Sequence, residues 1–400
     1  KLVGAAGLTV AGDIDVDGTT NLDIVDVDGA VNFAADVTFA DGADIITASA
    51  GTSNFRAGVN AGNSIASGGN YNVVVGDEAG TALTTGDYST FVGYGAGDAI
   101  NTADYNTAVG ANALSAETKG NRSVAVGMNA LLAQNFTSST DAYNVAVGMS
   151  AGAAVTTGAN NTLIGGLAGD AITTGYSNVS VGVNAAGATT VGFSNIAIGH
   201  GALHTNVDGS RSVAIGTTAL YTQEPASAVS MYNIAIGHDA GKLVTTGTAN
   251  VLIGGLSGDA ITTGGNNVAM GHTSLGSTTT GASNVAIGAD ALAANTTASN
   301  NTAVGKSALL ANTTGANLVA VGQNALSSNT TGNDSQAIGR NALDAQTTGG
   351  ANTAIGSDAL GVLTTGAFNV AVGNNALDAN TTADSSTAVG YQSLTANTTG

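Results

Sequence analysis

The stretch "NTAVGKSALLANTTGANLVAVGQNALSSNTTG", residues 301–332, contains nearly the same phrase twice, with its "AVG" glycine at Gly305 and again at Gly322. This glycine recurs in 19 units along the chain, with a 17-residue step sixteen times and a 21-residue step twice. Self-similarity at a fixed short period is the signature of a repeat architecture. We therefore predict that residues 72–400 form one array. Its marker glycines, each expected at a turn, are Gly76, Gly93, Gly110, Gly127, Gly148, Gly165, Gly182, Gly199, Gly216, Gly237, Gly254, Gly271, Gly288, Gly305, Gly322, Gly339, Gly356, Gly373 and Gly390.

The composition disfavours a conventional globular core. Glycine accounts for 59 of the 400 residues, aromatic residues for 4% and charged residues for 9%, and the chain contains neither Trp nor Cys. Such a chain has to bury small side chains many times over. Collagen is excluded because Pro occurs once, and disorder is disfavoured because 43% of the residues are hydrophobic and periodic. No apolar run is long enough for a membrane helix, so we expect no membrane insertion.

The columns of the repeat predict a short strand. With "NTAVGKSAL", residues 301–309, numbered as positions 1 to 9, positions 2 and 4 are almost always Val, Ile or Thr, and position 3 is Ala in 14 units. β-Branched residues at alternate positions favour a strand with one buried face. We expect positions 2 and 4 to form that face. The Ala column on the other face should allow another backbone to approach closely, so we expect that face to be covered too. Position 8 is small, which predicts a second strand or a turn.

Three further columns indicate scaffolding. The glycine at position 5 lies between strand-like residues, without the lysine or helix of a phosphate-binding loop, so we expect a turn or a close backbone approach. The "TTG" around position 15, such as Thr313, Thr314 and Gly315, predicts a second turn. Position 1 is Asn in 13 units and Ser in five, and stacked coils would make this column a hydrogen-bonded ladder.

Two other folds fit the repeat less well. Runs such as "ANALSA" are too short for a stable helix and end in Asn, Thr and Gly. A left-handed hexapeptide β-helix uses about 18 residues per coil but needs an apolar residue at every sixth position, which this repeat lacks. The predicted fold is all-β, a parallel β-solenoid of about nineteen coils, with the hexapeptide helix as the alternative.

Phrases such as "SVAIGTTAL" (212–220), "NIAIGHGAL" (195–203) and "NVAVGNNAL" (369–377) resemble the head repeats of trimeric autotransporter adhesins. The form "NTAVG…AL…NTTG" is also similar to repeats of phage tail-fibre and other surface-fibre proteins. This resemblance implies a left-handed β-roll and a homotrimeric fibre. The typical adhesin head unit is shorter, so the loop between strands should be longer here.

Residues 1–50 differ in kind and form a predicted acidic β-rich shaft segment, followed by a transition at 51–71. Asp alternates with Ile or Val, which is typical of strands, and the segment resembles the shaft repeats of phage tail fibres. Asp13, Asp15 and Asp17 match the first half of a calcium-binding loop, but Ile24 stands where the bidentate Glu is needed. Calcium binding and a solvated strand face both remain open for this segment.

Candidate catalytic and metal residues are scarce. His200, His238 and His272 share position 6 on coils too far apart for one metal ion, and Asp239, Asp290 and Asp358 are equally scattered. A net charge of −19 would repel nucleic acid and anionic membranes. We therefore expect no enzyme and no cofactor.

The polar, weakly charged repeats suit an extracellular fibre. The expected function is the shaft of a phage tail fibre that attaches to a host cell surface. Its expected partners are further copies of itself and cell-surface carbohydrate or another surface receptor. The alternative is a bacterial trimeric adhesin or another extracellular filament. An ice-binding threonine face is a third class, disfavoured because adjacent residues of a strand face opposite ways.

The two 21-residue steps predict outward bulges. They contain "LLAQNFTSSTDAY" (131–143) and "LYTQEPASAVSMY" (220–232), which are separated by the same interval as "LIGGLAGDAITTG" (163–175) and "LIGGLSGDAITTG" (252–264). This shared interval indicates that a block of five coils was duplicated whole. The only proline, Pro225, fits a loop. The loops also gather residues proposed as surface contacts or their polar neighbours: Phe136, Tyr143, Tyr221, Tyr232, Gln134 and Gln223.

Overall fold

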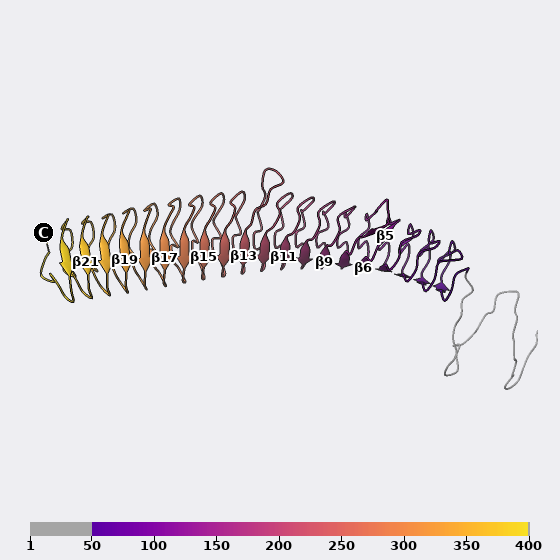
Figure 1. Ribbon diagram of the computed structural model, residues 1–400, viewed down its shortest axis with the longest axis horizontal. Helices are drawn as coiled ribbons and strands as arrows, with labels where there is room; N and C mark the ends of the chain where they lie inside the picture. The colour runs from indigo at the N-terminus through magenta and orange to yellow at the C-terminus, as the bar shows by residue number, and fades with distance from the viewer. Residues whose placement is uncertain (1–49, 399–400) are drawn as a thin grey trace, which may run out of the picture. The chain divides into compact units, whose positions relative to one another are not determined.

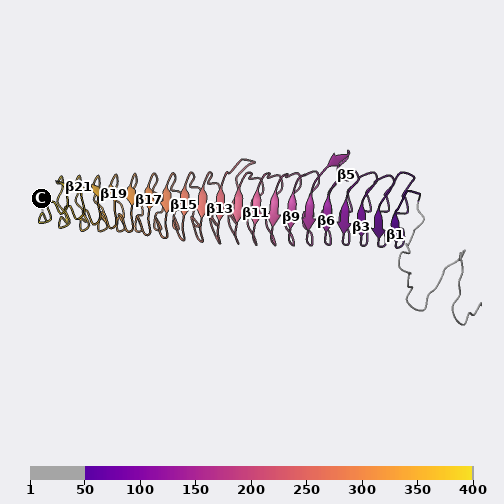
Figure 2. The same ribbon diagram turned by 60° about the horizontal axis from the view of Figure 1, so that its bottom comes forward.

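A computed structural model describes residues 50–398, in which the chain winds into successive stacked coils (Figures 1 and 2). Each coil contributes one three-residue strand to a single parallel sheet of 20 strands. No α-helix occurs between residues 50 and 398. The predicted all-β parallel solenoid with a 17-residue spacing is therefore confirmed. Within these residues each coil contributes one strand to the main sheet, and only two coils contain a second strand, rather than the several per coil that a hexapeptide helix requires.

The strands are short and evenly spaced, and each pairs in register with the strand of the next coil. Each coil takes the name of its strand in the main sheet. The strands of this sheet are β1 (Phe55–Ala57), β2 (Val73–Val75), β3 (Thr90–Val92), β4 (Thr107–Val109), β6 (Val124–Val126), β8 (Val145–Val147), β9 (Thr162–Ile164), β10 (Val179–Val181), β11 (Ile196–Ile198), β12 (Val213–Ile215), β13 (Ile234–Ile236), β14 (Val251–Ile253), β15 (Val268–Met270), β16 (Val285–Ile287), β17 (Thr302–Val304), β18 (Val319–Val321), β19 (Gln336–Ile338), β20 (Thr353–Ile355), β21 (Val370–Val372) and β22 (Thr387–Val389). A second sheet pairs β5 (Gly120–Asn121) with β7 (Thr140–Asp141).

The solenoid begins before the first repeat that the sequence reveals. Strand β1 lies in the segment 51–71 and pairs with β2, Phe55 opposite Val73. Gly58, just after β1, has a φ of 132°, like the marker glycines. This segment thus forms a coil of the same kind, although "FRAG" replaces the usual "TAVG".

The buried face of the strand is the opposite of the one that the sequence suggested. From β2 to β22, within the main sheet, the middle residue of every strand is buried, whereas the first and third residues are half-buried or exposed. Ala303 is buried, and its neighbours Thr302 and Val304 point outward. So short a coil encloses a narrow interior, and Ala at position 3 leaves room there for larger side chains from the other walls. Apart from Leu394 in the last coil, the Ala and Leu columns are therefore buried within one chain.

The turn after the strand depends on glycine, as predicted. The marker glycines have φ values between 125° and 141°, a region that residues with a side chain rarely adopt. They also lie against the next coil: a Cβ on Gly305 would be 2.5 Å from the carbonyl oxygen of Gly322. Positions 7 and 9 of the same turn are left-handed, as at Ser307 (φ 58°) and Leu309 (φ 52°). The turn reverses the chain while neighbouring coils stay in contact.

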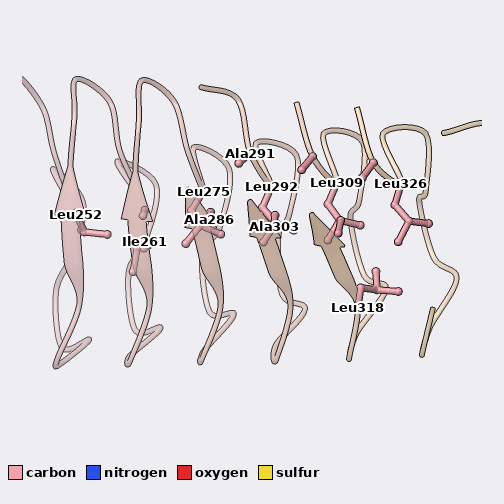
Figure 3. Packing of buried hydrophobic residues seen from close by; sticks show 14 of the residues in the cluster. Leu252, Ile261, Leu275, Ala286, Ala291, Leu292, Ala303, Leu309, Leu318 and Leu326 are labelled. Atoms are coloured by element: carbon pink, nitrogen blue, oxygen red, sulfur yellow. The ribbon is translucent and has the colours of Figure 1, made fainter. Parts of the chain in front are cut away.

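Two interior columns, positions 9 and 12, compensate for each other in side-chain volume. Position 9 carries a buried Leu in most coils, and Leu292, Leu309 and Leu326 occupy equivalent places in successive coils (Figure 3). Position 12 is then polar in nearly every case, as Asn312 is. Where position 9 is Gly, position 12 is aliphatic. These pairs are Gly80 with Leu83, Gly97 with Ile100, Gly152 with Val155, Gly169 with Ile172, Gly241 with Val244, and Gly258 with Ile261.

The predicted asparagine ladder is confirmed. Asn267 Oδ1 accepts the backbone N–H of Asn284 at 3.0 Å, and Asn267 Nδ2 donates to the carbonyl of Gly281 at 3.0 Å. Equivalent bonds recur in coil after coil. Because these side chains are fully buried, each ladder bond also satisfies backbone groups that water cannot reach.

The four extra residues of each insert leave the stacking unchanged. Val124 of β6 still pairs with Val145 of β8, and Val213 of β12 with Ile234 of β13, across the 21-residue steps. Residues 137–139 and 226–229 are exposed. The second insert projects from the row of coils between β12 and β13 (Figure 1). The prediction that the inserts bulge outward is confirmed.

Candidate interaction surface

An apolar stripe runs along the outside of the main sheet. We define it as the first and third residues of strands β2 to β22, β5 and β7 excepted. Between β8 and β20, the most accessible side chains at the third position are 36% to 41% exposed. Ile198, Ile287 and Ile338 are among them. Most stripe residues are Val or Ile. Apolar residues are therefore contiguous along this face from coil to coil.

The stripe carries no charge. In the coils that the structure describes from β2 onward, its polar residues are threonines and Gln336, and none is Asp, Glu, Lys or Arg. An exposed sheet face on a solvated monomer normally contains charged residues. The stripe therefore differs in composition from an ordinary solvated sheet face, because it is uncharged from β2 to β22.

A column of stacked planar side chains borders the stripe in the first coils. The rings of Tyr71 and Tyr88 are 5.0 Å apart, and those of Tyr88 and Tyr105 are 5.2 Å apart and nearly parallel. The Arg122 guanidinium continues the column, 4.8 Å from the Tyr105 ring and 5.8 Å from the Tyr143 ring. Partial burial among these neighbours, together with the adjoining tyrosines, raises the pKa of Tyr88.

Arg122 also ties this column to the first insert. Its Nε lies 3.0 Å from Asp141 Oδ1, in the strand β7 that closes the insert. Desolvation would raise the pKa of Asp141, but hydrogen bonds from Arg122 and Asn121 outweigh it and lower that pKa. The Arg122 guanidinium thus contacts two tyrosine rings, and its ion pair with Asp141 joins them to the base of the insert.

The second insert has a related column. The rings of Tyr176 and Phe193 stack at 4.9 Å, and Arg211 lies 4.9 Å from the Phe193 ring and 5.9 Å from the Tyr232 ring. Arg211 also donates a hydrogen bond to Ser230. Arg211 and Tyr232 are the duplicates of Arg122 and Tyr143, so the duplicated block preserved an arginine packed on an aromatic ring beside each insert.

The insert residues proposed as surface contacts fall into two groups. Tyr143 and Tyr232 are about half exposed, at 51% and 57%. Tyr221 is half-buried, with its ring stacked on His204 at 4.9 Å. Phe136 is buried at 7% exposure and is no surface contact in the described chain, because it packs at the base of the first insert. Only the two tyrosines are presented well to an external ligand.

The two glutamines of the inserts are interior rather than surface residues. Gln134 Nε2 donates to Glu117 Oε2 and to Ser123 Oγ, both at 2.9 Å, and its Oε1 accepts from Asn144. Glu117 is fully buried, and its Oε1 accepts the backbone N–H groups of Thr118, Lys119, Gly120 and Phe136. This buried carboxylate anchors the first insert. The sequence did not reveal it because position 12 is polar in so many units.

The paired threonines of "TTG" form a second regular surface. They lie in a bend, not a strand. The first of each pair donates its hydroxyl to the next coil, as Thr313 Oγ1 does to the Thr330 carbonyl at 3.0 Å. The second, such as Thr314, is exposed. The objection that adjacent threonines face opposite ways therefore does not apply to this bend, but the first threonine of a pair, such as Thr313, is half-buried and only the second is exposed.

The remaining candidate residues are not brought together. Among residues 50–398 no three His, Asp or Glu side chains lie close enough to hold a metal ion. His238 instead lies 3.6 Å from the neighbouring Asp239 carboxylate. Asp13, Asp15 and Asp17 lie outside the described residues.

Comparison with known proteins identifies no relative of the chain. No protein-family model and no curated protein matches the chain. The described residues also include no helix with the length and apolar character needed to cross a bilayer.

Proposed function

We propose that this chain is a non-enzymatic structural fibre, the shaft of a phage tail fibre that attaches to a host cell surface. The observation that supports it best is the uncharged apolar stripe on a stack of identical coils. Many side chains of a coil fill the interior, form a ladder to the next coil or lie on this repeated surface. A stack of this kind is suited to bridging distance.

The stripe supports self-association as a homotrimer. Nineteen coils at about 4.8 Å give a stripe of about 90 Å, and two columns of a strand span about 7 Å. Each chain would then bury roughly 600 Å² in the stripe alone, close to the ~800 Å² per partner of a standard stable interface, before the bordering tyrosines are counted. In this proposal three stripes meet around one axis, with each solenoid a left-handed β-roll.

Charge insertion tests this assembly directly. The double variant Ile287→Lys and Val321→Lys places two charges in the stripe, whereas Thr314→Lys and Thr331→Lys place them on the exposed threonine column. Sedimentation equilibrium should give a trimer for the parent chain and the threonine variant, and a smaller species for the stripe variant. A monomeric parent chain, or a trimeric stripe variant with unchanged circular dichroism, would contradict the proposal.

Electron microscopy of whole particles distinguishes the two fibre classes. An antibody against the repeats should decorate phage tail fibres if the chain is a tail-fibre shaft. Decoration of a bacterial surface would favour the alternative, an adhesin or another extracellular filament. The stack of coils is common to both functions, and the place where it is attached distinguishes them.

Cell-surface carbohydrate is the proposed external partner, contacted at the inserts. Tyr143 and Tyr232 offer amphipathic rings at half exposure, each next to an arginine. Replacing both with Ala should leave the solenoid folded and reduce binding of the purified fibre to host cells, measured by flow cytometry. A matched pair far from the inserts, Phe368→Ala and Tyr391→Ala, removes two exposed rings and should leave binding unchanged.

A further inference from the structure

The duplicated block provides an internal reference for each of its coils. The β10 coil (residues 178–194) corresponds to the β15 coil (residues 267–283). Three interior positions line up: position 3, position 9 and position 12. They hold Ser180, Ala186 and Thr189 in the β10 coil, and Ala269, Leu275 and Thr278 in the β15 coil. All six residues are buried.

These three positions surround one space. In the β9 coil, a Cβ on Gly169 at position 9 would lie 2.8 Å from both Leu163 Cδ2 and Ile172 Cδ1, the side chains of positions 3 and 12. In the β15 coil Leu275 points into the interior, one coil further along than Leu252 and Ile261 (Figure 3). Side chains from the same three positions therefore meet in the middle of each coil.

The β10 coil fills this space less than its duplicate does. Ala186 has three carbons fewer than the Leu275 side chain, and Ser180 has one oxygen more than Ala269, so the interior loses about two heavy atoms. Their share of the volume is sufficient for one water molecule, about 30 Å³. The two clusters of buried apolar residues also separate here: one ends at Ile172 and the other begins at Ala185.

The same coil holds two buried hydroxyls without a partner. Ser180 Oγ and Thr189 Oγ1 are inaccessible and form no hydrogen bond to protein. In the duplicate, Thr278 Oγ1 accepts from Asn295 Nδ2 at 3.2 Å. The residue equivalent to Asn295 is Asn206. Both amides donate to the carbonyl three residues further on, Asn206 to Gly209 at 2.7 Å and Asn295 to Ala298 at 3.1 Å, but Asn206 forms no bond to Thr189. Thr189 thus loses the partner that its duplicate keeps.

We propose that the β10 coil contains a binding site for one internal water molecule, held between Ser180 Oγ and Thr189 Oγ1. A buried hydroxyl without a partner is costly, and internal waters bind where a polar space offers two or more partners. The water takes the place that the Leu275 side chain fills in the duplicate, at the point where the two apolar clusters separate.

The sign of one substitution tests the site. With a bound water, Ser180→Ala removes a ligand of that water, and backbone amides of the β10 coil should exchange hydrogen roughly fivefold to thirtyfold faster. Without it, Ser180→Ala removes an unpaired hydroxyl and exchange should slow, which overturns the proposal. Ala186→Leu copies the duplicate, should expel the water and should abolish the long-lived water signal in ¹⁷O relaxation dispersion of the full chain.

The duplicate offers a gain-of-site control. Ala269→Ser with Leu275→Ala recreates the β10 interior in the β15 coil and should add one long-lived water. A crystal structure of the parent chain should show the water within hydrogen-bond distance of both hydroxyls. Direct bonds from Ser180 and Thr189 to backbone carbonyls, with no water between them, would overturn the site.

Discussion

Gly241 and Leu252 share one interior space: a Cβ on Gly241 would lie 2.7 Å from Leu252 Cδ1. They belong to neighbouring coils, so the size of one residue limits the other across the stack. The backbone of Gly241 (φ 57°) is nearly that of Leu309 (φ 52°), which carries the usual leucine of this position. Packing, and not backbone conformation, therefore selects glycine at position 241.

Gly241→Leu and Leu252→Ala should rescue each other. The first overpacks the interior, at about 1–3 kcal/mol, and the second leaves it underfilled, at about 2–5 kcal/mol. The double variant should cost less than the sum, with a coupling of about 0.5–3 kcal/mol, because the new leucine occupies the freed volume. Urea denaturation of the four proteins measures the cycle. Strictly additive costs would show that the two sites do not share a space.

Gly305→Ala should disrupt its coil, whereas Gly166→Ala should be tolerated. Gly305 combines a φ of 134° with a Cβ position 2.5 Å from the Gly322 oxygen, and such strain costs of order 1–3 kcal/mol or more. Gly166 follows a marker glycine, and a Cβ there would meet nothing within 4 Å. Thermal melts followed by circular dichroism compare the two. Equal melting temperatures would refute the close approach of coils.

Asn267→Ala should weaken the ladder locally. The substitution leaves the Asn284 N–H and the Gly281 carbonyl without their side-chain partner, at about 1–3 kcal/mol for each unsatisfied group. Hydrogen exchange should accelerate in the β15 and β16 coils and remain unchanged in distant coils. The exposed Asn374→Ala is the matched control and should change neither.

Glu117→Leu should destabilise the first insert more than Glu117→Gln does. Leucine removes the acceptor of four backbone N–H groups, whereas glutamine keeps one carbonyl oxygen for them and disturbs only the contact with Gln134 Nε2. Limited proteolysis at residues 137–139 should be fastest in the leucine variant. Equal cleavage of the two variants would argue against the carboxylate as an anchor.

Asp344→Asn should stabilise the solenoid at neutral pH. Burial, and then the negative charge of Asp358, raises the pKa of Asp344, so the folded state binds its proton more tightly than the unfolded state does. The ionised form therefore costs stability above the raised pKa, and this cost disappears as the pH falls through that value. The melting temperature of the variant should exceed that of the parent at pH 7 and approach it in acid. A gain that grows in acid would reverse the argument.

The sequence was sufficient to predict the length and the elements of the coil. It was not sufficient to predict which strand residues face the interior and which face outward. Repeat length, the strand at "TAV", the glycine turn and the asparagine ladder follow from single columns, and each is observed. The orientation of Val304 does not follow, because β-branched residues favour strands whichever way they face. The inverse relation between the side-chain sizes at positions 9 and 12 could have identified the interior. Two columns compensate for each other in volume only when their side chains share one buried space.

The surface of the inserts was predicted less well for a similar reason. An aromatic or amide residue in a bulge can point outward, as Tyr232 does, or cap the interior, as Phe136 and Gln134 do. Composition does not distinguish these cases. The distinction depends on partners far away in sequence, such as Glu117 for Gln134.

The ladders that join each coil to the next also determine how this molecule bears load. Tension along the axis would act on the coils in series, so the weakest coil yields first while the others keep their bonds. Each 17-residue coil that peels away would release roughly 50 Å of extended chain, at about 3.4 Å per residue less one stacking distance. Under tension the stack of coils would lengthen stepwise and dissipate mechanical work at each step.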